Sequence, residues 1–179
     1  MRTPVLIWFA AFVVAGVMPL PVTTGYVPPA AAEEASLGST FTALPGRWTG
    51  QGRLGYKDGK METVTCRATY FRGETASNLR QTIRCATASG KIELKSEITE
   101  HEGKLSGSWV EQMFELAGEL SGEITPKGLR VTVKGENLDA NMDIIVRENK
   151  QVVEIQFHNT SLVGMTLILD RSSSAGGES

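Results

Sequence analysis

Residues 46–54, GRWTGQGRL, place one tryptophan among glycines at the start of the folded part of the chain. Side chains two positions apart share one face of a β-strand, so Trp48 is followed on its own face by Gly50 and Gly52. Glycine weakens a strand and is tolerated where the sheet bends sharply or where another backbone approaches closely. The stretch therefore predicts a strongly coiled first strand whose indole fills one end of a closed sheet.

Alternation of apolar and polar residues continues from Arg47 to Arg171. The clearest case is KIELKSEI, residues 91–98, in which Ile and Leu alternate with Lys and Glu. This period of two is typical of strands with one face in a core and one face in water. The segments are joined by short turns rich in glycine and asparagine, such as Asp58-Gly59 and Gly135-Glu136-Asn137.

Connections this short make successive strands antiparallel neighbours. An open sheet of about ten strands would leave two unpaired edges, which closure into a barrel removes. We therefore predict an all-β fold, a single antiparallel up-and-down barrel of about ten strands, with a β-sandwich as the alternative. The least supported turn is the one at residues 112–115, which has no glycine or proline.

The N-terminus has the order of a secretory signal peptide. Arg2 precedes an apolar run from Val5 to Met18, and the small residues Ala30–Ala32 offer a cleavage site. We expect residues 1–32 to be removed, 33–45 to be flexible, 46–171 to form the barrel domain and 172–179 to be a disordered tail. The expected location is periplasmic or secreted, without an integral membrane span in the mature chain. An uncleaved N-terminal anchor is the alternative.

The balance of basic and acidic residues limits the classes of molecule that the chain can bind. The full sequence has 18 basic and 20 acidic residues, a formal net charge of −2. Arg2 is the one charged residue within residues 1–32. Cleavage after residue 32 therefore leaves 17 basic and 20 acidic residues. A chain with this balance lacks the basic excess that nucleic-acid binding needs, and we expect no nucleic-acid partner. A protein partner cannot be named from the sequence.

The two cysteines fall on consecutive predicted strands. Pairing these strands about the turn at residues 72–77 puts Cys66 directly opposite Cys85, on the apolar face. Both types of antiparallel residue pair lie within disulfide range. In an exported chain this arrangement predicts one structural disulfide. A redox pair or metal site is disfavoured, because there is no C-x-x-C spacing and no histidine nearby in sequence.

The pattern around Trp48 resembles that of the calycin-type barrels. Gly46-Arg47-Trp48 matches the G-x-W at the start of the first lipocalin strand, and Gly46, Trp48, Gly50 and Gly52 fit the G-x-W-x-G-x-G of nitrobindin-like proteins. The resemblance implies that Arg171, at the end of the last predicted strand, packs over Trp48. The repeated GKLSGSWVE and GELSGEI also resemble small exported proteins of unassigned function in alphaproteobacteria.

The inward side chains suggest a ligand site. The predicted binding residues are Trp48, Tyr70, Trp109 and Phe157, and they alternate with small positions that leave volume free. We expect a small hydrophobic ligand and no catalysis, because no set of titratable groups has useful spacing, and we predict no cofactor and no metal. The first alternative is a filled barrel that serves as an envelope structural or protein-interaction module.

The third functional hypothesis, haem or nitric-oxide binding, comes from the resemblance, because nitrobindin-like proteins bind haem through a histidine near the C-terminal end. The corresponding residue here would be His158. Strand parity places His158 outside with the charged residues, and His101 falls in a predicted turn. Haem or nitric-oxide binding is therefore the last of the three functional hypotheses.

Overall fold

The computed structural model describes residues 41–172, which form ten β-strands. The predicted signal peptide, residues 33–40 and residues 173–179 lie outside the described residues. Within 41–172, no helix is long and apolar enough to span a membrane. The strands are β1 (Gly46–Tyr56), β2 (Met61–Arg72), β3 (Asn78–Ala86), β4 (Lys91–His101), β5 (Lys104–Glu111), β6 (Leu116–Thr125), β7 (Gly128–Gly135), β8 (Asp139–Arg147), β9 (Lys150–Phe157) and β10 (Leu162–Arg171).

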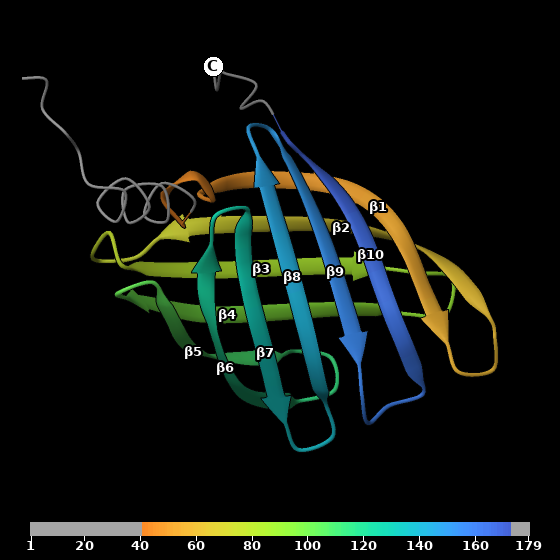
Figure 1. Cartoon of the computed structure of the whole chain (residues 1–179). Coiled ribbons are helices and arrows are strands. Elements are labelled where there is room, and N and C mark those ends of the chain that lie inside the picture. The colour runs from red at the N-terminus through yellow and green to blue at the C-terminus, as the bar shows by residue number, and fades with distance from the viewer. Residues whose placement is uncertain (1–40, 173–179) are drawn as a thin grey trace, which may run out of the picture.

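The ten strands make one closed antiparallel barrel (Figure 1). Each strand pairs with the next along the chain, and β10 returns to pair with β1, with Trp48 opposite Arg171 and Gly50 opposite Leu169. The predicted up-and-down barrel is confirmed. The β-sandwich alternative is wrong, because backbone hydrogen bonds join the first and last strands.

The barrel has two distinct ends. We call the end that holds the start of β1 and the end of β10 the tryptophan end. The opposite end, the far end, carries the turns that follow β1, β3, β5, β7 and β9. The core residues of the two ends belong to one continuous hydrophobic cluster.

Residues 41–45 pack against the tryptophan end. They were expected to belong to a flexible segment, but Phe41 and Leu44 are buried in the core cluster. A short helical segment at residues 41–43 precedes β1, and the Leu44 N–H donates to the Phe41 carbonyl at 3.4 Å. The expectation of flexibility is corrected for these residues, because two apolar side chains there have a barrel end to cover.

The disulfide is confirmed. Cys66 and Cys85 face each other directly in the β2–β3 ladder, and their sulfurs are 2.06 Å apart. The pairs Ala68–Ile83 and Tyr70–Gln81 have the register expected from the turn at residues 72–77. The bond links neighbouring strands over a separation of 19 residues.

The β5–β6 turn forms without glycine because a carboxylate organises it. The buried Glu111 side chain accepts hydrogen bonds from the backbone N–H groups of Glu93, Met113 and Phe114 at 3.0, 2.9 and 2.6 Å. Glu115 then adopts a positive φ of 56°. Hydrogen bonding by the side chain thus organises a turn that has no glycine.

The glycines of β1 allow close approach of β10. A Cβ atom added at Gly50 would lie 2.0 Å from the carbonyl oxygen of Ile168, and one at Gly52 would lie 1.8 Å from that of Thr166. Both distances are far below van der Waals contact, and the obstructing atoms are backbone. The sequence pattern thus serves barrel closure, since any side chain at these two positions would push the last strand away.

Gly50→Ala is expected to lower the free energy of unfolding by about 1–3 kcal/mol, because the methyl group forces β1 and β10 apart. Gly90→Ala is the matched control, since a Cβ there meets no atom within 4 Å and its backbone conformation suits alanine. Urea unfolding followed by circular dichroism measures both variants. Equal stability of the two variants would contradict the role assigned to close strand approach.

Candidate functional site

The tryptophan end is closed by contacts between the two ends of the described chain. Trp48 is fully buried, at 0% exposure, and its Nε1–H donates to the Leu44 carbonyl at 2.9 Å. The Arg171 guanidinium lies 4.2 Å from the centre of the Trp48 ring. It also donates to the carbonyl of Pro45 at 2.7 Å and to that of Ala43. Arg171 therefore joins β10, the indole and the segment that covers it.

An internal cavity of about 160 Å³ lies within the barrel. Of the four side chains predicted to bind a ligand, Tyr70, Trp109 and Phe157 line it and Trp48 does not. Trp48 is instead enclosed by Leu44 and Arg171 at the tryptophan end. The structure agrees with the predicted filling of one barrel end by this indole, but it does not bring Trp48 to the cavity.

The remaining lining is almost entirely aliphatic. The alternation of side chains along each strand identifies these positions as inward, but it does not distinguish a cavity wall from a packed core. The residues come from β2–β10 and one turn: Cys66, Ala68, Gln81, Ile83, Cys85, Ile92, Leu94, Ser96, Ile98, Leu105, Leu120, Leu129, Val131, Val133, Leu138, Ala140, Met142, Ile144, Val153, Ile155, Met165, Leu167 and Leu169.

Trp109 occupies space that the sequence suggested would be free. A Cβ at Gly118 would lie 2.8 Å from Trp109 Nε1, and one at Gly135 would lie 2.7 Å from its Cζ2. The indole N–H donates to the Lys134 carbonyl at 3.1 Å. The indole therefore packs against the backbones of Gly118 and Gly135, where a side chain would have no room.

Besides Trp109, whose indole N–H is bonded to the Lys134 carbonyl, the cavity wall contains three hydrogen-bonding side chains. Tyr70, Gln81 and Ser96 line it, and all three are buried. The Tyr70 hydroxyl donates to Oε1 of the fully buried Gln151 at 3.3 Å. Burial raises the pKa of Tyr70 to about 12, an effect that hydrogen bonds with Gln81 and Gln151 oppose. Tyr70 is therefore a neutral phenol at physiological pH.

The far end of the barrel is the more exposed side of the cavity. Ile92, at the start of β4, lines the cavity and is nevertheless 38% exposed. Phe157 and Leu138, near the adjacent turns, are half-buried lining residues. Met113 and Phe114, in the β5–β6 turn at this end, are 60% and 67% exposed. Entry is thus easier at the far end than past Trp48.

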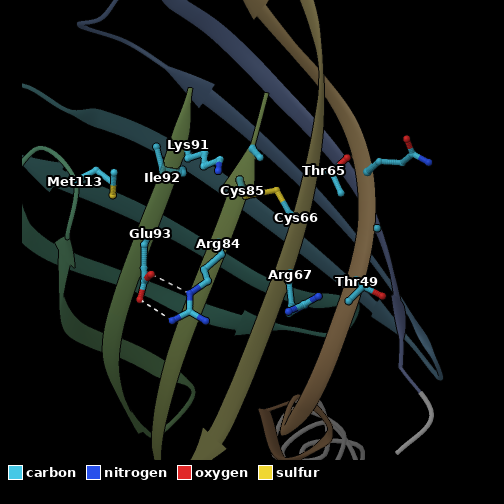
Figure 2. Close-up of a pocket in the computed structure, with 13 residues that line it drawn as sticks. Thr49, Thr65, Cys66, Arg67, Arg84, Cys85, Lys91, Ile92, Glu93 and Met113 are labelled. Atoms are coloured by element: carbon cyan, nitrogen blue, oxygen red, sulfur yellow. Dashed lines mark hydrogen bonds and ion pairs between the residues drawn. A yellow bond between two sulfur atoms is a disulfide. The ribbon is translucent and has the colours of Figure 1, made fainter. Parts of the chain in front are cut away.

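A second concavity, a groove of about 510 Å³, crosses the outer face of β1–β4 (Figure 2). Thr49, Arg67, Arg84 and Glu93 form one cross-strand row there. Arg84 is bound to Glu93 through two hydrogen bonds of 2.9 and 3.0 Å. The hydrogen bond and charge of Arg84 lower the pKa of Glu93. Arg67 stands directly opposite Arg84, and like charges in that position repel.

The groove belongs to a basic surface that we call the arginine face. It consists of the outward charged side chains of β1–β4, which are seven basic and two acidic residues: Arg47, Arg53, Arg67, Arg80, Arg84, Lys91, Lys95, Glu93 and Glu97. Among the ion pairs formed within residues 41–172, the only one on this face joins Arg84 and Glu93. A net negative chain thus carries a locally positive surface.

Neither histidine reaches the cavity. His158 is exposed, and its Nε2 lies 3.1 Å from the Asn141 amide nitrogen. His101 lies at the end of β4 with a side chain that is also exposed. In the described part of the chain, no group of three or more His, Cys, Asp or Glu residues is arranged to hold a metal ion.

Comparison with known proteins gives structural relatives only. No family model and no curated protein matches the sequence. The solved structure of Rv2717c from M. tuberculosis aligns with a TM-score of 0.65 at 10% identity, covering 76% of this chain and 98% of that one. The S-type phycobiliprotein lyase CPES from Guillardia theta aligns with a TM-score of 0.55 at 10% identity, covering 79% and 98%. The chain has a calycin-type fold. At such low identity the likeness concerns the fold alone.

Arg171→Lys is expected to lower the free energy of unfolding by about 1–2 kcal/mol. Lysine keeps the charge but loses the planar fork that both stacks on Trp48 and binds two carbonyl groups. The measurement is urea unfolding followed by tryptophan fluorescence. Arg147→Lys, an exposed position at the end of β8, is the control and is expected to be neutral. An unchanged free energy of unfolding in Arg171→Lys would contradict the role assigned to the Arg171 contacts.

Proposed function

We propose that this protein is a non-catalytic, exported barrel that binds one compact, mainly apolar molecule in its internal cavity, for carriage, sequestration or sensing. The observation that carries the proposal is the cavity of about 160 Å³ with a largely aliphatic wall. An apolar cavity of about 150 Å³ is large enough to hold benzene or xenon. The expected ligand is thus about the size of a single ring.

The size of the cavity argues against the larger ligands that the fold can accommodate. Pockets for drug-sized molecules have volumes of about 300–1,000 Å³, well above the volume found here. Haem would also need a ligating side chain, and His158 is exposed on the outer surface. We therefore do not favour haem or nitric-oxide binding through His158.

The composition of the cavity wall supports a binding function without catalysis. No Asp, Glu, His, Lys or Arg is among the side chains that line it. General acid–base catalysis needs a positioned group that can gain or lose a proton near the working pH. One structural relative is named a phycobiliprotein lyase, so an enzyme exists with a similar fold. The wall described here contains no side chain that would gain or lose a proton near neutral pH.

A second candidate function uses the outside of the barrel. We infer from the arginine face that the protein docks an acidic segment of a partner protein across the groove of β1–β4. Arg67 has no carboxylate partner within residues 41–172 and faces the like charge of Arg84. An incoming carboxylate would relieve that repulsion and could bind a guanidinium through two hydrogen bonds. This second candidate is the protein-interaction module that the sequence offered as an alternative. Its docking surface would be the arginine face.

Ligand binding is tested by titrating the protein with fluorobenzene and following the ¹⁹F NMR signal. Saturable binding is expected, because the cavity is of suitable size and polarity. Ala140→Leu, which puts a larger side chain on the cavity wall, is expected to weaken binding at least about tenfold. Ala117→Leu adds the same side chain at an exposed position on β6 and should leave binding unchanged. Equal affinities in the two variants would exclude the cavity as the site.

Docking on the arginine face is tested with a fluorescent oligo-glutamate peptide at low ionic strength. Arg67→Gln is expected to weaken its binding by roughly three- to tenfold, and added salt should weaken it further. The control is Arg147→Gln, which removes the same charge outside the arginine face. Equal effects of the two substitutions would mean that only overall charge matters. Preference for phosphatidylglycerol vesicles over the peptide would reject the protein-segment assignment.

A further inference from the structure

Three hydrogen-bonding side chains of the cavity wall lie in one row across neighbouring strands. Tyr70 on β2 is the direct cross-strand partner of Gln81 on β3, and Gln81 is that of Ser96 on β4. Direct partners in an antiparallel sheet point to the same side at the same level. The three side chains therefore make one polar strip, which we call the polar row, on an otherwise apolar wall.

The polar row has hydrogen-bonding capacity that the protein itself does not use. The Ser96 hydroxyl faces the cavity and makes no side-chain hydrogen bond within residues 41–172. Gln151, on β9, accepts the hydrogen bond from Tyr70, and its buried Nε2 has no partner in the same part of the chain. Buried polar groups are nearly always hydrogen-bonded, and leaving one unpaired is unfavourable. A ligand atom that hydrogen-bonds at Ser96 would use the hydroxyl group that faces the cavity.

Charge restricts what can occupy that position. None of the lining side chains is a carboxylate, a histidine or a basic residue, and burial keeps Tyr70 protonated. An ionised group that entered would lose its hydration without meeting an opposite charge, which is strongly unfavourable. A neutral hydroxyl or carbonyl would lose much less hydration and could recover a hydrogen bond from the row.

We propose that the cavity selects compact uncharged molecules with a single hydroxyl or carbonyl group, and that the polar row of Tyr70, Gln81 and Ser96 binds this group. The proposal rests on the proposed cavity function and adds the chemistry and orientation of the ligand. The polar group points to the wall of β2–β4, and the apolar body of the molecule contacts the aliphatic residues of the remaining strands.

The experiment compares three probes of similar shape, each followed by ¹⁹F NMR with the purified full-length chain at neutral pH: fluorobenzene, 4-fluorophenol and 4-fluorobenzoate. In a wholly apolar cavity the hydroxyl group would weaken binding, because its hydration is lost without replacement. Here 4-fluorophenol is expected to bind about two- to tenfold more tightly than fluorobenzene, the effect of one net hydrogen bond. 4-Fluorobenzoate is expected to bind at least about tenfold more weakly than 4-fluorophenol.

The variant Ser96→Ala identifies the atom responsible. It is expected to weaken 4-fluorophenol binding by about two- to tenfold and to leave fluorobenzene binding unchanged, since only the hydroxyl contact is lost. Ser106→Ala makes the same change at an exposed position on β5 and should alter neither affinity. Circular dichroism of both variants controls for folding.

The outcomes separate this inference from the proposed function. If fluorobenzene binds but 4-fluorophenol binds no more tightly, or if 4-fluorobenzoate binds as well as the phenol, the inference is overturned and the cavity function stands. An unchanged phenol affinity in Ser96→Ala also overturns it. If none of the three probes binds, the proposed function itself fails and the inference fails with it.

Discussion

The fold depends on the approach of the last strand to the first. The backbone of β10 lies so close to β1 that Gly50 and Gly52 have no room for a side chain. Without that pairing, ten antiparallel strands would form an open sheet with two exposed edges. Closure also brings Arg171 over Trp48, so that the indole, the guanidinium and the carbonyls of the covering segment form one contact region. Gly50, Gly52 and Arg171 thus all act where β1 meets β10.

The packing of the barrel interior differs between its two ends. At the tryptophan end, Phe41, Leu44 and Trp48 are all buried in the core cluster. Beyond the Tyr70–Gln151 hydrogen bond lies the cavity, whose wall is aliphatic apart from the polar row. The barrel is therefore neither uniformly filled nor uniformly hollow. The tryptophan end is filled by buried side chains, while the proposed ligand site is the cavity, which is most exposed at the far end.

The two candidate functions use opposite faces of the same strands. On β2–β4 the inward residues include Tyr70, Gln81 and Ser96, whereas the outward residues include Arg67 and Arg84. Alternation along a strand lets the two faces carry unrelated chemistry. The disulfide lies in the same strands and holds β2 and β3 in the register on which both surfaces depend. Cavity binding and external docking are thus compatible within one molecule.

The sequence by itself determined the strand count, the antiparallel order, the disulfide register and the inner or outer face of each side chain. These are local properties, because a period of two and short turns are visible within each pair of neighbouring strands. It missed the packing of residues 41–45 and the carboxylate that forms the β5–β6 turn, since both depend on contacts between separate segments. The glycine pattern predicted that Trp48 fills one end of the barrel, but only the tertiary structure decided that Tyr70, Trp109 and Phe157 line a cavity from which Trp48 is absent. The tertiary structure also gathered seven basic side chains on one face of a chain with net negative charge. Depth within a barrel and charge on its surface both follow from the stagger and curvature of all ten strands, which no single segment encodes.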